Sequence, residues 1–434
     1  MLSFIDTVIL KIISTLTVEV IFITLIFSHI SPSLDFSLLS HYNKTRFLRE
    51  KRAFMDMIYF DHAATTRVLP EAAQAAVEAM TVAYGNPSSL YALGTQAAKA
   101  VAEHRATVAQ ALGCRPEELY FTSCGTEGDN WAVQLAVHLG RHKGKHIITT
   151  AVEHSAVLEP CKALEMQGYE VTYLHPDATG HIRIEALEEA LRPDTVLVSM
   201  LLVNNETGAI QPVAEAAQVL KRHKSNALLH TDAVQGFLKL PFTPKGLGAD
   251  LVTISGHKIG AMKGSGALFI RSGLRAIPLL RGGGQEKGLR SGTEATPQIA
   301  ALAAAAKLGK DALDEHIAYL NDLKAYALAQ FQALVPGLVV VSAGDAPHIC
   351  AISLPGYPSQ VVVRYLSDQG FCLSAGSACH RGKASHVYAA MNLSKPVRDG
   401  MLRVSFGPSN TKEEVDKLAQ ALLGVTKTLV AAGR

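Results

Sequence analysis

The stretch LVTISGHK, residues 251–258, decides the fold of this chain. Its first four residues are apolar or β-branched, which is typical of a buried strand. Lys258 follows that strand after Ser-Gly-His, so its amine is placed at the strand's carboxyl end. Ligands of open α/β sheets bind at such ends, and a lysine amine there can form a Schiff base with an aldehyde. For an isolated lysine, the alternative is a solvated side chain.

Short apolar runs of the same kind recur along the chain on both sides of this stretch. They occupy residues 119–121, 146–148, 171–174, 196–203, 227–229 and 267–270. Helical patterns accompany them at residues 70–84, 94–112, 128–139, 156–166 and 213–223. Alternation of strands and helices predicts an α/β fold, in which helices cover both faces of a mostly parallel sheet.

The pattern changes in the last third of the chain. Residues 294–334 are mainly helical and rich in alanine, and shorter strands and helices follow, ending in a helix over residues 412–430. We therefore expect a large domain over residues 73–310 and a smaller α+β domain over residues 311–434. Residues 57–72 are expected to be an N-terminal segment that packs with the small domain.

Residues 1–56 differ from the rest. Their apolar part, residues 10–30, is interrupted by Lys11 and Glu19, and the uninterrupted portion is shorter than the roughly 20 residues that cross a bilayer. A basic cluster follows at residues 44–52. Three interpretations stay open: a start codon assigned too far upstream of Met55 or Met57, an apolar membrane anchor, and a poorly ordered leader.

Composition excludes some classes of protein. The 434 residues carry 41 basic and 38 acidic side chains, a net charge of +3, which leaves no electrostatic footprint for nucleic acid. The six cysteines are scattered and form no pair or cluster at the spacing of a zinc site. A reducing compartment fits this pattern, so we expect a cytoplasmic protein without a resident metal ion.

Two further strand ends carry polar groups. Asp232 follows the apolar run at residues 227–229, at the end of that expected strand. A carboxylate near a Schiff-base lysine can pair with the pyridinium nitrogen of pyridoxal phosphate; the alternative is a helix cap. Residues 121–127 run from a strand through small residues into a helix, whose N-terminus suits a phosphate. Ser255 and His257 can add donors to that phosphate, and simple helix entry is the alternative.

Eight motifs resemble the class V aminotransferase-like enzymes and, within them, the cysteine desulfurases (NifS/IscS-like), from about residue 58 to the C-terminus. They are YFDHAATT (59–66), GNPSS (85–89), FTSCGTEGDN (121–130), EH (153–154), VNNETG (203–208), SGHK (255–258), RSGT (290–293) and SAGSAC (374–379). The resemblance implies the type I fold of pyridoxal-phosphate-dependent transferases, with a seven-stranded sheet in the large domain.

The resemblance also implies a role for each matching residue. Lys258 would form the Schiff base with pyridoxal 5'-phosphate, Asp232 would pair with its pyridine nitrogen, and His154 would stack on its ring and assist proton transfer. The phosphate would be held by Gly125, Thr126, Ser255 and His257. Thr293 would reach the phosphate of the other subunit, which implies a homodimer with shared active sites. Substrate and ring hydroxyl would be contacted by Asn205, Gln235 and Arg403.

Cys379 is the expected nucleophile. It follows the small residues 374–378 and precedes His380 and Arg381, a basic setting that favours the thiolate. The resemblance implies that Cys379 takes sulfur from L-cysteine as a persulfide and leaves L-alanine. It would then serve a sulfur acceptor such as an iron–sulfur scaffold or a thio-cofactor pathway, touching a cluster only transiently. A selenocysteine lyase and a class V aminotransferase are the alternative enzymes on this scaffold.

Overall fold

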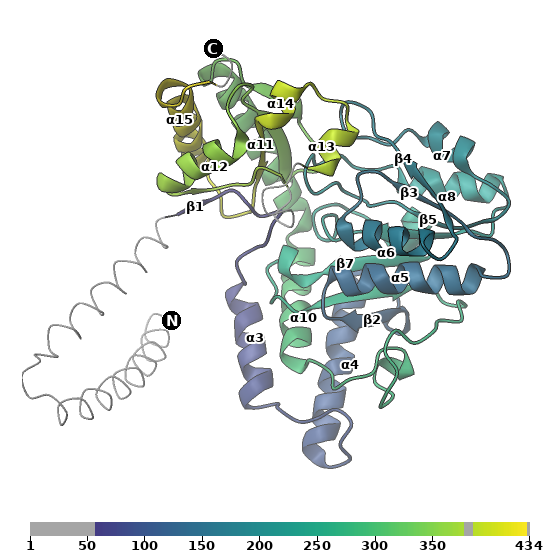
Figure 1. Ribbon diagram of the computed structural model, residues 1–434. Helices are drawn as coiled ribbons and strands as arrows, with labels where there is room; N and C mark the ends of the chain where they lie inside the picture. Colours follow the sequence, from purple (N-terminus) through teal and green to yellow (C-terminus); the bar gives the residue numbers. More distant parts are fainter. Residues whose placement is uncertain (1–56, 377–384, 432–434) are drawn as a thin grey trace, which may run out of the picture. The chain divides into compact units, whose positions relative to one another are not determined.

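The structure is a computed structural model that describes residues 57–376 and 385–431 (Figure 1). The expectations for residues 1–56 and for Cys379 lie outside the described residues. The described residues from Tyr59 onward belong to one compact unit of the chain. In the part of the chain that the structure describes, none of the helices combines the length and the apolar character needed to span a bilayer.

The larger sheet has seven strands in the order β2-β8-β7-β6-β5-β3-β4. Neighbouring strands are parallel, except that β8 is antiparallel to both of its neighbours. The predicted mostly parallel, seven-stranded sheet is therefore confirmed. Its strands are β2 (Leu119–Thr122), β3 (His146–Thr150), β4 (Glu170–Leu174), β5 (Thr195–Ser199), β6 (Leu228–Asp232), β7 (Leu251–Ser255) and β8 (Gly266–Ile270).

Helices cover both faces of this sheet, because successive strand residues point to opposite sides. Ile148, Val198 and Val252 join a core cluster that is completed by residues of α4, α8 and α10. Their neighbours Ile147 and Leu251 join a second cluster with residues of α5 and α6. The helices of this region are α3 (Pro70–Thr81), α4 (Ala92–Leu112), α5 (Gly125–Gly140), α6 (Ser155–Glu165), α7 (Ile184–Ala190), α8 (Val213–Arg222), α9 (Pro244–Leu247) and α10 (Thr296–Asp311).

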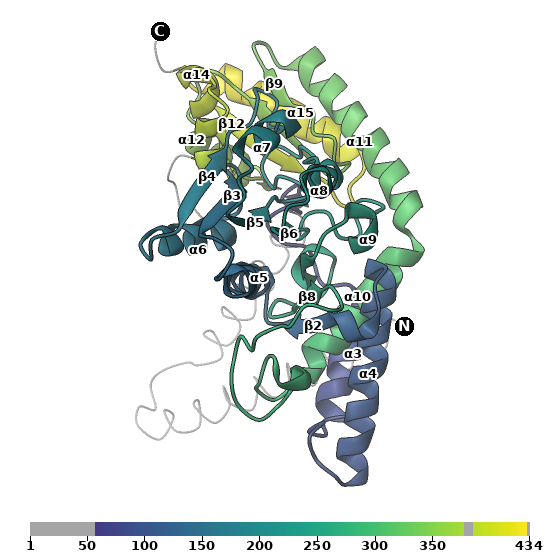
Figure 2. The same ribbon diagram turned by 90° about the vertical axis from the view of Figure 1, so that its right-hand side faces the viewer.

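A second, antiparallel sheet of three strands lies toward the C-terminus, in the order β12-β10-β9 (Figure 2). The expected division at residue 311 stays a prediction. The elements of this region are α11 (Leu313–Leu334), β9 (Val339–Ser342), β10 (Ile349–Ser353), α12 (Ser359–Asp368), β11 (Phe371–Cys372), α13 (His386–Ala390), α14 (Lys395–Asp399), β12 (Met401–Ser405) and α15 (Lys412–Thr428).

The segment after β1 (Ile58–Tyr59) joins the C-terminal strands by backbone hydrogen bonds. The Phe60 N–H donates to the Cys372 carbonyl over 2.8 Å, and the Ser405 N–H donates to the Phe60 carbonyl over 2.8 Å. The Asn410 side chain donates to the Tyr59 carbonyl over 2.9 Å. This pairing brings residues 61–66 beside the carboxyl ends of the large sheet, although more than 160 positions separate them in sequence from Lys258.

One expected strand is shorter than its apolar run. Residues 196–203 are continuously apolar or β-branched apart from Ser199, yet β5 ends at Ser199. The Met200 and Leu202 amides still donate to carbonyls at the end of β6, over 3.1 and 2.9 Å. Asn204 then closes a turn, because its side-chain carbonyl accepts from the amides of Glu206 and Thr207. Burial, rather than strand pairing, accounts for the apolar residues at the end of this run.

Candidate active site

A cavity of about 210 Å³ opens at the carboxyl ends of β6 and β7. This is the edge at which ligands bind in open α/β sheets. Ten of the residues predicted from the sequence line it, from six separate stretches of the chain: Gly125, Thr126, His154, Asn205, Asp232, Gln235, Ser255, His257, Lys258 and Arg403.

Lys258 lies in the short 3-10 helix η2 (Gly256–Lys258), directly after β7. Its amine donates to the Ala63 and Ala64 carbonyls over 2.6 and 2.7 Å. These bonds hold the amine against the N-terminal segment at the wall of the cavity. The Gln235 side chain donates to the same Ala63 carbonyl over 2.9 Å, so this carbonyl orients two groups of the site.

Asp232 is the last residue of β6 and is 8% exposed. Its Oδ1 accepts the Val234 N–H over 2.9 Å. Burial and the neighbouring Asp129 raise the pKa of Asp232 to about 7, against the opposing influence of His154 and Lys258. A carboxyl group in this state gains a strong partner when a cationic ring nitrogen enters the cavity.

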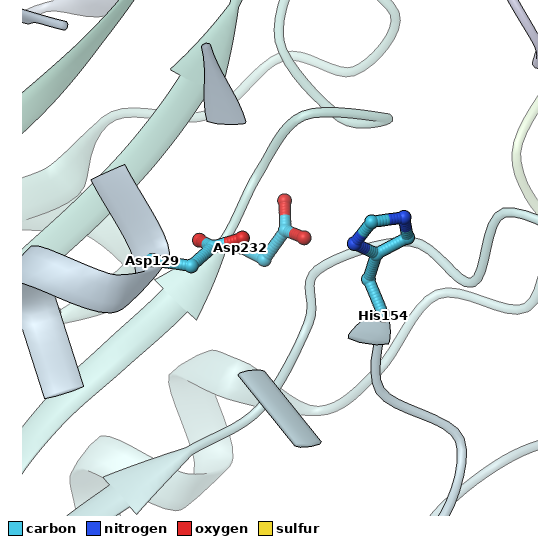
Figure 3. Close-up of side chains that lie close together, drawn as sticks. All are labelled: Asp129, His154 and Asp232. Atoms are coloured by element: carbon cyan, nitrogen blue, oxygen red, sulfur yellow. The ribbon is translucent and has the colours of Figure 1, made fainter. Parts of the chain in front are cut away.

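His154 caps the N-terminus of α6, where its Nδ1 accepts the Ala156 N–H over 3.2 Å. Figure 3 shows its ring directed toward Asp232, with Asp129 behind. One ligand-type atom from each of these three residues lies within 4.8 Å of the others. Two carboxylates and an imidazole can bind a cation. That cation can be a metal ion or a protonated pyridine nitrogen.

The start of α5 forms another wall of the cavity. A Cβ at Gly125 would lie 2.9 Å from Cγ2 of Val234, so a larger residue there would force the Val234 side chain to shift. Ser255 Oγ is buried and has no hydrogen-bond partner among the described residues. Burial and the nearby Lys258 lower the pKa of His257 to about 4. A phosphate at this helix N-terminus would provide the acceptor that Ser255 needs.

Arg403 comes from β12 and is 1% exposed. Its guanidinium donates from Nη1 to the Asn205 carbonyl over 2.8 Å and from Nη2 to Asp61 Oδ1 over 2.7 Å. Its Nε is buried and lacks a partner among the described residues. The guanidinium therefore keeps a donor for an anionic ligand group, such as a carboxylate.

Thr293 does not line this cavity. It is exposed, and its neighbours Gly292 and Glu294 line a smaller cavity of about 60 Å³ behind residues 121–123. Sequence reasoning missed three groups at the site: Asp129 and the carbonyls of Ala63 and Ala64. Asp129 lies inside the motif at residues 121–130. It does not follow a strand directly, so the strand-end criterion that selected Lys258 and Asp232 could not select it.

Comparison with known proteins settles the family. The model of the aminotransferase class-V family matches residues 58–418. The chain belongs to this family. It is 40% identical over 384 residues to cysteine desulfurase 2 of Trichormus variabilis, covering 87% of this chain and 95% of that protein. It is 38% identical to cysteine desulfurase IscS of Methanosarcina thermophila, covering 86% and 92% of the two chains.

Solved structures agree with the sequence relatives. A NifS-like protein superposes with a TM-score of 0.81 at 34% identity, covering 86% of this chain and all of that one. DndA from Streptomyces lividans superposes with a TM-score of 0.67 at 38% identity, covering 80% and 99%. The family and fold predicted from the sequence are therefore confirmed.

The family depends on pyridoxal phosphate, and the cavity fits that cofactor. Lys258 is placed for the aldehyde and the buried Asp232 for the ring nitrogen. The unpartnered Ser255 hydroxyl and the N-terminus of α5 are placed for the phosphate. The role of each of these residues stays a prediction.

Proposed function

We propose that this protein is a pyridoxal-phosphate-dependent cysteine desulfurase, which converts L-cysteine to L-alanine and transfers the sulfur to Cys379. The observation that carries the proposal is the convergence of Lys258, Asp232 and Arg403 on one cavity of a class-V aminotransferase fold. The relatives named cysteine desulfurase support the choice of reaction within that family.

The residues of the cavity divide the work. Arg403 binds the substrate carboxylate, because its guanidinium is fixed by Asp61 and Asn205 and keeps the Nε donor. Lys258 would hold the cofactor, and its amine, when free, would take the proton from the substrate α-carbon. The bound cofactor supplies an electron sink for the pair left by that proton.

Cys379 completes the reaction in this proposal. Its thiolate attacks the substrate sulfur, so that a sulfur–sulfur bond forms while the carbon–sulfur bond breaks. The electron pair of the broken bond stays with the carbon, which takes up a proton and leaves as alanine. The enzyme retains a persulfide, which it passes to an acceptor such as an iron–sulfur scaffold.

We infer a homodimer with shared sites as the working form. Thr293 is exposed rather than directed into the cavity of its own chain, as expected if it reaches a partner's phosphate. Large apolar side chains are exposed in one stretch that runs from α3 to the residue before α4: Val77, Met80, Val82, Tyr84, Leu90 and Tyr91. Exposed apolar groups of this kind are typical of an interface. A cytoplasmic location stays a prediction.

The deciding experiment compares wild type, Cys379→Ala and Cys372→Ala as purified full-length proteins. Each is given L-cysteine and a reductant, and sulfide and alanine are measured together. We expect wild type and Cys372→Ala each to form sulfide and alanine in equal amounts. Cys372 is the matched control because its thiol is half-buried. Cys379→Ala is expected to keep its bound chromophore and to lose at least about 10²-fold in rate, as for a missing nucleophile.

Two results would replace the proposal. Strong preference for selenocysteine, with activity retained by Cys379→Ala, favours a selenocysteine lyase. Absence of sulfide together with amino-group transfer to a 2-oxo acid favours an aminotransferase.

A further inference from the structure

Asp129 is a buried acid that the proposed chemistry does not yet use. It belongs to α5, is 1% exposed and lines the same cavity as Asp232. Carboxylate oxygens of the two residues lie within 4.8 Å of each other, side by side in Figure 3. Asp129 Oδ1 is buried and accepts no hydrogen bond from any of the described residues. A buried carboxylate left in this state is costly unless a proton or a cation joins it.

His230 stands behind Asp129 and is fully buried. Its Nε2 lies 3.5 Å from Asp129 Oδ1 and 3.2 Å from Thr253 Oγ1, while its Nδ1 lies 2.8 Å from Ser199 Oγ. The imidazole is therefore tied to two hydroxyl groups on neighbouring strands. It lies beside the Asp129 carboxylate without a hydrogen bond to Oδ1, and Asp129 also lines the cavity.

The other titratable groups near the pair lie in η2 and in residues 153–154, directly before α6. Lys258 of η2 and His154 at the start of α6 lower the pKa of Asp232, which favours its charged form. Glu153 is fully buried and has its own pKa raised well above normal, by burial first and by both aspartates in addition. Asp129 and Asp232 thus line the cavity as neighbouring carboxyl groups, and the fully buried Glu153 lies near both of them.

We propose that Asp129 is a positioning residue that pairs with Asp232 to form a double-carboxylate seat for the pyridine nitrogen, which holds that nitrogen protonated. This inference rests on the proposed function, because it assigns the site to pyridoxal phosphate. Asp129 adds a second negative charge beside Asp232, so that the ring nitrogen faces two carboxylates in place of one. An opposite charge within about 4–6 Å shifts a pKa by 1–3 units toward the charged form.

The proton balance of this seat is closed. Without cofactor, burial and the neighbouring Asp129 raise the pKa of Asp232 to about 7, so that Asp232 can carry a proton near neutral pH. When the ring enters, that proton moves to the pyridine nitrogen, and both carboxylates then face a cation. No oxidant, reductant or other reactant is needed.

The test compares pyridoxal 5'-phosphate with its 1-deaza analogue, in which carbon replaces the ring nitrogen. Cofactor-free wild type, Asp129→Asn and Asp250→Asn are titrated with each compound at pH 8, and dissociation constants are read from absorbance. Asp250 is the matched control, because its carboxylate bonds Leu229 and Arg271 at the opposite end of β6 and β7. Asp129→Asn is expected to lower the preference for the natural cofactor over the analogue by about tenfold, the equivalent of one pKa unit.

A structural role for Asp129 would weaken the binding of both compounds equally, and that outcome overturns the inference. If Asp129→Asn does not fold, infrared spectra of wild type decide. We expect a buried protonated carboxyl band near neutral pH that disappears with pyridoxal 5'-phosphate and persists with the analogue; persistence with both overturns the inference. Failure of wild type to bind either compound or to release sulfide would instead overturn the proposed function.

Discussion

At one end of the cavity Arg403 meets Asp61 over 2.7 Å and the Asn205 carbonyl over 2.8 Å, whereas at the other end two buried carboxylates, Asp129 and Asp232, meet each other. At the first end, Asp61 balances the charge of Arg403, and the Arg403 Nε–H is a donor without a partner among the described residues. The second end brings two buried carboxylates together, and burial first and Asp129 second raise the pKa of Asp232, against the opposing influence of His154 and Lys258. In the proposed function, the first end binds the anionic group of the substrate and the second end binds the cationic ring.

Lys258 lies between the two ends, so its removal should have the largest effect. In Lys258→Ala, alanine formation is expected to fall by more than about 10³-fold, because both the Schiff base and the proton acceptor are lost. The cofactor should no longer be fixed to the protein by borohydride, which mass spectrometry checks. Activity within about tenfold of wild type would show that another group performs the proton transfer.

Arg403→Ala should weaken substrate binding at the Arg403 end of the cavity and leave cofactor binding at the other end intact. We expect the KM for L-cysteine to rise by about 10²-fold, because a buried charge-assisted contact is lost and Asp61 loses its ion pair with Arg403. The dissociation constant of pyridoxal phosphate should stay nearly unchanged, since the opposite end is untouched. Steady-state kinetics and cofactor titration check both values. Equal damage to cofactor binding would mean that the two ends are not separate.

Asp232→Asn tests the carboxylate end of the cavity through the pH dependence of the free energy of unfolding. The folded-state pKa of Asp232, about 7, lies above its unfolded value, so its stabilising effect is present below about pH 4 and is lost as pH rises to about 7. Cofactor-free wild type should therefore lose about 2–3 kcal/mol relative to Asp232→Asn across this range. Urea unfolding at pH 4.5 and 7.5 measures the difference. An unchanged difference between the two pH values would contradict the raised pKa.

Much of this site could be predicted from the sequence, because its residues follow local signals. Lys258 and Asp232 stand directly after buried strands, and the turn before α5 leads from a strand into a helix N-terminus. Parallel strands deliver all their carboxyl ends to one edge, so such positions converge without knowledge of side-chain geometry. The motifs around these residues then indicated the family, which the relatives confirm.

The partners of these residues could not be predicted in the same way. Asp129 faces inward from the first turns of α5, a position that resembles any buried helix residue in sequence. The carbonyls of Ala63 and Ala64 have no side-chain signature at all, yet they hold the Lys258 amine. Arg403 reaches Asp61 across 342 positions of sequence, through pairing of the N-terminal segment with β12.

The sequence by itself determined the alternation of strands and helices, the strand-end positions of Lys258 and Asp232, and the family. Periodicity and turn residues act over short distances along the chain, which is why they can be recognised without coordinates. Only the tertiary structure decided that an arginine–aspartate ion pair lies at one end of the cavity and two neighbouring buried carboxylates at the other. Charge compensation depends on which distant groups share a buried volume, and packing alone fixes that.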